Sequence, residues 1–353
     1  MSHYKEDIRE VLIKAVSDKA TDLYVIAGLD LTVKKNGTFS SVGDRLTPND
    51  CKDIVRDIYE LANMEEQRSL KVDDDFSFGL NSIGRFRVNV FKQRGSWSAV
   101  IRLIQFGLPS AEEMNIPQKV LDFANEKNGL ILVTGPAGGG KSTTLSCIIN
   151  QINETKQKHI ITLEDPIEFV YRHGNSIVTQ REIGNDVESY EVAMRSVMRE
   201  STDVVLLGEM RDKETMEVAI SAAEIGQLIF STLHTIGAAN TIDRVLDSFP
   251  PNQQQQIRLQ LALTLKGVIS QQLVPGVDGK LVPVFEIMRT NIAISNMIRD
   301  ARIHQITSAM VADPEMITMD ASLVELVKTG KITKDTALEY AMNVNWLKRK
   351  LEQ

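Results

Sequence analysis

The spacing of apolar and polar residues changes along the chain and predicts regions of different architecture. In the first hundred residues, short runs often alternate between apolar and polar positions, which is typical of strands with one buried face. Strands are predicted at 22–26, 31–35, 76–80, 86–91 and 97–104. Helical spacing occurs at 6–16, and again after Thr47, a predicted N-cap, to about residue 66. This pattern predicts a small α/β domain over residues 1–106.

The second part of the chain shows apolar runs without alternation, as expected for strands buried on both faces. These runs are 130–133, 159–163, 204–207 and 227–232. Because these apolar runs alternate with helical segments along the chain, they predict a mostly parallel sheet with helices on both faces, over residues 118–290. After Pro251 the spacing becomes helical, with 257–273 as the longest such stretch. Residues 107–117, with two prolines, are interpreted as a linker, and 291–353 as a helical region.

Composition narrows the class of protein. A chain of 353 residues exceeds what one hydrophobic core usually supports, and its net charge of −7 argues against nucleic-acid binding as the main function. Residues 1–11 are charged and lack the apolar centre of a signal peptide, and no apolar run approaches the ~20 residues of a membrane span. The two cysteines, Cys51 and Cys147, lie far apart, which fits neither a disulfide framework nor a zinc knuckle. We therefore expect a cytoplasmic protein.

The strongest chemical signal lies between the apolar run 130–133 and a helical stretch at 143–152. There the sequence GPAGGGKSTT matches the phosphate-binding pattern G-x-x-x-x-G-K-S. Small residues allow backbone N–H groups to close around phosphate oxygens at the positive end of a helix. Lys141 is expected to reach the β- and γ-phosphates, and the Ser142 hydroxyl to bind Mg²⁺. The predicted residues of this ATP or GTP site are Gly135, Pro136, Ala137, Gly138, Gly139, Gly140, Lys141, Ser142, Thr143 and Thr144.

Three further candidates follow predicted strands, at the sheet edge where doubly wound folds bind ligands. Glu164, in ITLEDPIE, could orient and deprotonate an attacking water, although an acidic surface turn is an equally simple interpretation. Glu209 ends the run VVLLGE, which resembles a Walker B strand with Gly208 at the usual aspartate position. Glu209 would then carry the Mg²⁺-binding or water-orienting role alone. His234 could position the water or sense phosphate charge, although a lone histidine is more often structural.

These segments occur in the order found in the secretion ATPase superfamily. They are the glycine-rich Walker A motif at 135–144, ITLEDPIE at 161–168, GEMRD at 208–212 and STLHT at 231–235. Four further family motifs occur as well, GRFRVNVF at 84–91, SFPPNQQ at 248–254, ISQQLVP at 269–275 and FEIM at 285–288. The similarity therefore covers nearly the whole chain. The chain most resembles the twitching-motility branch, the PilT-type ATPases of type IV pilus retraction. In that family, Glu164 corresponds to the Asp-box acid, Glu209 to the Walker B acid and His234 to the His-box histidine.

The resemblance also implies an architecture and partners. It implies a PAS-like N-terminal domain, a RecA-like P-loop ATPase core and a C-terminal helical segment. The family works as a homohexameric ring that hydrolyses MgATP. Such a ring docks on a pilus platform protein at the cytoplasmic face of the inner membrane, so that membrane association is peripheral and occurs through partners.

Several positions depart from the family pattern and leave alternatives open. Gln227 replaces a second histidine, Ser295 an arginine and Tyr24 a histidine, and the usual Asp-Pro-Asp reads Ser-Thr-Asp at 201–203. These departures are compatible with an accessory motor or a non-hydrolysing regulatory ring subunit. Extension and type II secretion ATPases are a further alternative, but they usually carry a four-cysteine zinc insertion and a longer N-terminal region, which this sequence lacks.

Two arginines are predicted to face each other in the N-terminal domain. A hairpin centred on Arg94-Gly95 places Arg87 directly opposite Arg102 on one face of the sheet. Like charges in such a pair are destabilising, so this is either a solvated basic face or a site where both guanidinium groups meet an anion. Matching arginines in the resembling family act on the γ-phosphate held by the adjacent subunit, as arginine fingers in trans.

Overall fold

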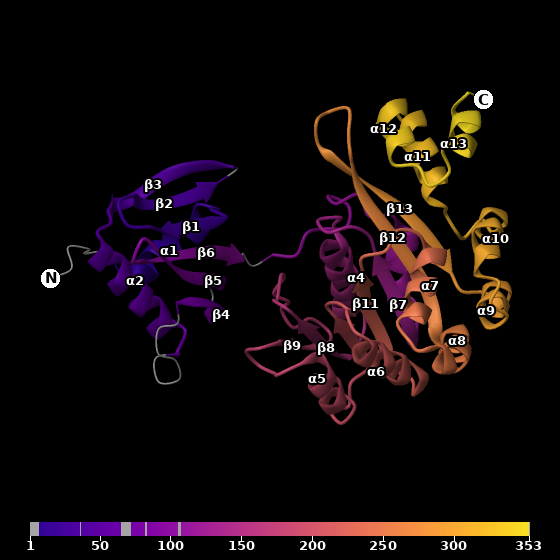
Figure 1. The fold of residues 1–353 in the computed structure, drawn as a ribbon, viewed down its shortest axis with the longest axis horizontal. Helices are drawn as coiled ribbons and strands as arrows, with labels where there is room; N and C mark the ends of the chain where they lie inside the picture. The colour runs from indigo at the N-terminus through magenta and orange to yellow at the C-terminus, as the bar shows by residue number, and fades with distance from the viewer. Residues whose placement is uncertain (1–6, 36, 65–71, 82, 105–106, 353) are drawn as a thin grey trace. The chain divides into compact units, whose positions relative to one another are not determined.

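The computed structural model describes residues 7–35, 37–64, 72–81, 83–104 and 107–352. The chain divides into two compact units, Met1–Gly107 with Glu168–Tyr171, and Leu108–Ile167 with Arg172–Gln353 (Figure 1). Each unit has its own sheet and its own hydrophobic core. None of the described helices is long and apolar enough to cross a bilayer.

The N-terminal unit is an antiparallel sheet covered on one face by two helices, α1 (Ile8–Ser17) and α2 (Pro48–Leu61). Its six strands have the order β3-β2-β1-β6-β5-β4. Their bounds are β1 Asp22–Val25, β2 Asp30–Lys35, β3 Thr38–Arg45, β4 Asp73–Leu80, β5 Gly84–Gln93 and β6 Ser96–Ile104. Along β5, buried residues such as Phe86 and Val88 alternate with more exposed ones, so the alternation in the sequence correctly predicted the buried face.

Local signals in this unit agree with the structure in most places. Thr47 caps α2 as predicted, because its hydroxyl accepts from the Asp50 N–H at 3.2 Å while the Asp50 carboxylate accepts from the Thr47 N–H at 2.8 Å. The helix ends at Leu61, earlier than predicted, and Asn63 then adopts a left-handed φ of 55°. Residue 66, where the helix was predicted to end, lies outside the described residues.

The predicted hairpin register is confirmed. Arg94 and Gly95 both have positive φ, 50° and 82°, as a two-residue turn of this kind requires. Gln93 pairs with Ser96, and counting back along the two strands brings Arg87 opposite Arg102. The turn thereby determines which side chains meet on the exposed face of the sheet.

The second unit is built on a sheet of seven strands in the order β13-β12-β7-β11-β10-β8-β9. All neighbouring strands are parallel except β12 and β13, so the sheet is mostly parallel as predicted. The strand bounds are β7 Gly129–Thr134, β8 His159–Glu164, β9 Ile177–Glu182, β10 Val204–Leu207, β11 Leu228–Leu233, β12 Leu265–Pro275 and β13 Leu281–Arg289.

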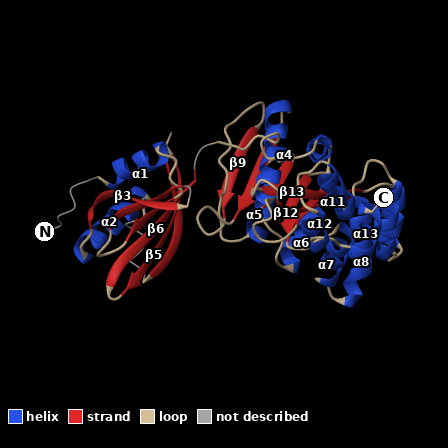
Figure 2. Cartoon of the chain, turned by 90° about the horizontal axis from the view of Figure 1, so that it is seen from above, coloured by secondary structure: helices blue, strands red, loops and turns tan. Residues whose placement is uncertain are grey.

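Helices cover both faces of this sheet, and Figure 2 shows α4 on one side and α6, α7 and α8 on the other. The large core cluster joins residues of β7, β8, β10 and β11 to α5, α6, α7 and α8. α4 packs against β7 and also contacts the short helix α3 (Gln118–Leu121). The bounds of the larger helices are α4 Lys141–Thr155, α5 Tyr190–Val197, α6 Lys213–Glu224, α7 Ala238–Asp247 and α8 Pro251–Thr264.

The predicted helical stretch 257–273 is wrong beyond Thr264, where α8 ends and β12 begins. β12 lies between β7 and β13 and is buried on both faces, so its apolar run carries no two-residue period that would mark it as a strand. Gly267 allows this packing, since a Cβ there would lie 2.4 Å from the Phe123 ring. Strands β9 and β13 were also not predicted.

The C-terminal tail is helical as expected, but it is not a compact unit of its own. Residues of α9 (Ile292–Arg299) and α10 (Ile306–Ala312) join the large core cluster of the sheet. The helices α11 (Met319–Lys328), α12 (Lys334–Glu339) and α13 (Val344–Leu351) form a smaller cluster with the ends of β12 and β13, at Val274 and Val284.

Candidate functional site

The glycine-rich loop between β7 and α4 is held against strand β12. Gly135 has a φ of 144°, and a Cβ at this position would lie 2.0 Å from the backbone oxygen of Gln271. Gly140 is the N-cap of α4 with a φ of 82°, and its Cβ would lie 2.7 Å from Nε2 of Gln271. Both glycines are therefore required by a positive φ and by the close approach of Gln271.

The Lys141 side chain lies back over this loop. Its Nζ donates to the carbonyl oxygens of Gly135 and Pro136, both at 2.9 Å, and lies 3.5 Å from Nδ1 of His234. The ammonium group thus occupies the concave side of the loop. Ser142 and Thr143 form the first turn of α4, and the Thr144 hydroxyl donates to Oε1 of Gln271 at 2.6 Å.

Glu209 is held between a histidine and an arginine just after β10. Oε1 of Glu209 lies 3.0 Å from Nε2 of His234, which follows β11, and Oε2 accepts from Nε of Arg211 at 2.9 Å. Lys141, His234 and Glu209 are therefore linked through the two ring nitrogens of His234. The structure brings these three predicted residues together at the carboxyl ends of neighbouring strands.

Glu164 ends β8 at the same edge of the sheet and is buried, with 8% of its surface exposed. Its Oε1 accepts from the Thr162 hydroxyl at 2.6 Å and from Nε2 of Gln180 at 3.4 Å. A buried carboxylate with defined donors is not an acidic surface turn, which was the alternative interpretation. Asp165, the next residue, is exposed.

The backbone at Gly208, just before Glu209, is closely surrounded by other parts of the chain. A Cβ at Gly208 would lie 3.0 Å from the Tyr190 hydroxyl and 3.3 Å from the Leu163 carbonyl oxygen. Because these distances are shorter than most Cβ contacts, a side chain at this position requires the Tyr190 hydroxyl or the neighbouring backbone to move. The only acid that β10 presents at this point is Glu209.

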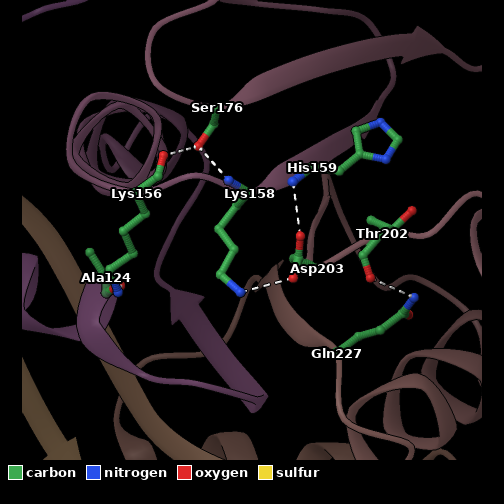
Figure 3. A network of polar contacts seen from close by, with 8 residues as sticks. All are labelled: Ala124, Lys156, Lys158, His159, Ser176, Thr202, Asp203 and Gln227. Carbon is green, nitrogen blue, oxygen red and sulfur yellow. Dashed lines mark hydrogen bonds and ion pairs between the residues drawn. The ribbon is translucent and has the colours of Figure 1, made fainter.

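Gln227 lies at the opposite, amino-terminal edge of the sheet (Figure 3). Its Nε2 donates to the Thr202 carbonyl at 3.3 Å, and its Oε1 is buried without a partner among the described residues. Asp203, next to Thr202, accepts from Nζ of Lys158 at 2.8 Å and from the His159 N–H at 3.0 Å. Two departures from the family pattern, at 227 and 201–203, therefore belong to one network away from the phosphate-binding loop.

The other departures also have structural partners. The Ser295 hydroxyl in α9 donates to the Ala262 carbonyl in the last turns of α8, so serine joins two helices here. Tyr24 packs edge-on against Phe39, with ring centroids 5.4 Å apart. Neither side chain is among the contacts of the phosphate-binding loop.

Arg87 and Arg102 line one hollow on the sheet of the N-terminal unit, together with Asp22, Asp75, Asn89 and Val100. Nε of Arg102 lies 3.1 Å from Oδ1 of Asp22, and Nε of Arg87 lies 3.7 Å from Oδ1 of Asp75. The facing positive charges are thus balanced by two carboxylates, which the sequence analysis did not anticipate. These pairs are partly exposed, so their contribution to stability is small.

Sequence reasoning missed two residues of the candidate site. Gln271 was missed because ISQQLVP was interpreted as helix, and Tyr190 because α5 carries no recognised motif. The signal for Gln271 was present, since a buried run next to a family motif can equally be a central strand. No signal in the sequence marked Tyr190.

We expect Gln271→Ala to weaken ATP binding about tenfold, because it leaves the buried Thr144 hydroxyl without its acceptor and removes support from the loop. A fluorescent ATP analogue titrated into the purified protein measures this. Gln272→Ala is the matched control, since Gln272 is also buried in β12 but points to the opposite face. Equal affinity of the Gln271→Ala and Gln272→Ala proteins would contradict the supporting role.

Comparisons with known proteins agree with this arrangement. The type IV pilus retraction ATPase PilT of Pseudomonas aeruginosa is 39% identical over 95% of this chain and 98% of its own length. The type IV pilus ATPase PilU of the same organism is 35% identical over 96% of this chain and 90% of its own. A crystal structure of the pilus retraction motor PilT with bound ADP superimposes with a TM-score of 0.87 and 42% identity, covering 98% of this chain and 100% of that one.

The sequence model of the family described as Type II/IV secretion system protein matches residues 6–342. The match spans both compact units and includes every candidate residue described above. The fold is therefore a RecA-like ATPase core preceded by a smaller domain, as in the structure with bound ADP. The chain belongs to the Type II/IV secretion system protein family and is a P-loop ATPase.

Proposed function

We propose that this ATPase hydrolyses MgATP to power the retraction of a type IV pilus. The proposal rests mainly on the contacts that link Lys141 to Glu209 through His234. These three residues lie beside the glycine-rich loop, at the carboxyl-end edge of the sheet. Similarity over 95% of the chain to a pilus retraction ATPase supports retraction as the direction in which the motor works. The accessory-motor alternative keeps some support, because PilU is similar over almost the same length.

Lys141 is the residue that changes partners when nucleotide binds. Its ammonium group now donates to two loop carbonyls, and these weak acceptors are replaced by the charged β- and γ-phosphate oxygens. Ser142 and Glu209 offer one hydroxyl and one carboxylate for Mg²⁺, which suits an ion that keeps most of its ligands as water and phosphate oxygens. The ion, when bound, neutralises charge that develops on the phosphates.

Glu164 and Glu209 have environments suited to different tasks. Both carboxylate oxygens of Glu209 are engaged, one by His234 and one by Arg211, so this side chain is fixed in place. Glu164 accepts hydrogen bonds on Oε1 from neutral donors, the Thr162 hydroxyl and the Gln180 amide, and is buried at the same edge. We assign Glu164 as the general base for the attacking water and Glu209 to the Mg²⁺ side, with His234 positioning Glu209 and facing Lys141.

We expect Lys141→Ala to abolish phosphate release, because several kcal/mol of charge stabilisation at the transferred phosphoryl group are lost. Cells that carry this variant in place of the native protein should extend pili but fail to retract them, as labelled pili in time-lapse imaging will show. Lys127→Ala, an exposed lysine before β7, is the matched control. Loss of pilus extension instead of retraction would contradict the assignment of a retraction motor.

We further propose that the active form is a homohexameric ring at the cytoplasmic face of the inner membrane, bound to the pilus platform protein. Arg87 and Arg102 support a ring, because two guanidinium groups lie side by side in a compact unit that does not contain the phosphate-binding loop. Asp22 and Asp75 hold the two guanidinium groups in place. In a ring, these arginines would stabilise the γ-phosphate of the neighbouring subunit.

A mixing experiment tests this arrangement. Rings of Arg102→Ala subunits and rings of Lys141→Ala subunits should each be nearly inactive, because an arginine finger contributes about 10³-fold or more to the rate. Mixed rings should recover hydrolysis at interfaces that pair an intact Arg102 with an intact Lys141. Arg94→Ala, in the turn of the same hairpin, is the control and should keep full activity. The trans arrangement is wrong if mixing restores nothing, or if Arg102→Ala alone hydrolyses ATP normally.

A further inference from the structure

The Tyr190 hydroxyl lies at the same sheet edge as the two candidate glutamates. Tyr190 is the first residue of α5, after the N-cap Ser189. Its hydroxyl oxygen lies 3.0 Å from the position of a Cβ at Gly208, where Leu163 O and Glu164 Cα lie 3.3 and 3.4 Å away. The hydroxyl group therefore stands over the carboxyl ends of β8 and β10, where Glu164 and Glu209 project.

The Tyr190 ring is fixed by packing, whereas its hydroxyl group is available as a hydrogen-bond donor. The ring packs against the large core cluster beneath the sheet edge, so the side chain cannot easily swing away. Among the described residues, the hydroxyl makes no hydrogen bond within the chain. A rigid ring that presents an available O–H donor beside the candidate catalytic residues is suited to hold a small polar molecule such as water.

The charges around Tyr190 keep its hydroxyl protonated. Burial raises the pKa of Tyr190, and the nearby carboxylates of Asp165, Glu164 and Glu209 raise it further, while Arg211 acts in the opposite direction. Because the ordinary pKa of tyrosine, about 10, is already above physiological pH, a tyrosine whose pKa is raised further stays neutral there. Tyr190 is thus a hydrogen-bond donor, and it cannot serve as a general base.

We propose that Tyr190 is a positioning residue for ATP hydrolysis, whose hydroxyl donates a hydrogen bond to the attacking water at the ends of β8 and β10. This inference rests on the proposed hydrolysis at this edge. The two protons of the water then point toward carboxylate acceptors, and the remaining lone pair points toward the γ-phosphate. The glycine at 208 is explained as well, because it leaves room for the hydroxyl.

Tyr190→Phe tests the proposal, because it removes only the hydroxyl and keeps the packed ring. We expect kcat to fall about tenfold, the loss of one hydrogen bond in the transition state. KM for ATP, the binding of a fluorescent ATP analogue and the thermal unfolding midpoint should not change. Tyr340→Phe, a half-buried tyrosine directly after α12, is the matched control. Unchanged kcat, or a fall in kcat that is matched by weaker ATP binding or lower thermal stability, would overturn the proposal.

A second variant tests the contact with Gly208. Gly208→Ala should lower kcat in the native background, because its methyl group displaces the Tyr190 hydroxyl. In the Tyr190→Phe background the same substitution should lower kcat less, and purely additive losses would contradict the placement of the hydroxyl. Glu164→Gln, measured in parallel, tests the general base separately. If Glu164→Gln keeps full turnover, Glu164 is not the base, while the kcat of Tyr190→Phe still decides whether the Tyr190 hydroxyl contributes.

Discussion

The close approach of strand β12 to the glycine-rich loop is the constraint on which the candidate site depends. β12 pairs with β7 as far as Ser270 opposite Thr134, and the next residue, Gln271, meets Gly135 directly. Its side chain then reaches Thr144 in α4. One residue thus supports both ends of the loop, and only glycine fits where its backbone and amide come close. The backbone groups that would bind phosphate are held in place by this contact.

Once the loop is held, the order of the strands brings the chemistry together. β11 lies beside β7 and carries His234, and β10 lies beside β11 and carries Glu209. β8 follows with Glu164, above which the Tyr190 hydroxyl stands. Parallel strands present their carboxyl ends at one edge, so residues far apart in sequence become neighbours without any strain. The departures at Gln227 and Thr202 lie at the other edge, and they leave this set unchanged.

The sequence revealed the fold where local chemistry determines structure. The Arg94-Gly95 turn was sufficient to predict the register of Arg87 and Arg102, and the glycine-rich pattern predicted the loop and its helix. Prediction from the sequence failed where burial by distant parts of the chain determines the structure. β12 looks helical because both of its faces are covered, and nothing local places Asp22 and Asp75 beside the two arginines. The same failure concealed Gln271, the residue that supports the loop.

Amide hydrogen exchange, resolved to single residues of the loop, tests most directly whether the loop is already formed before nucleotide binds, as its contact with β12 requires. The Gly135 N–H donates to the Leu233 carbonyl and the Gly139 N–H to the Pro136 carbonyl. We predict that both amides are already protected in the nucleotide-free protein, and that MgADP adds protection only at other amides of the loop. Rapid exchange at Gly135 and Gly139 until MgADP is added would contradict a preformed loop, and with it the supporting role of Gln271.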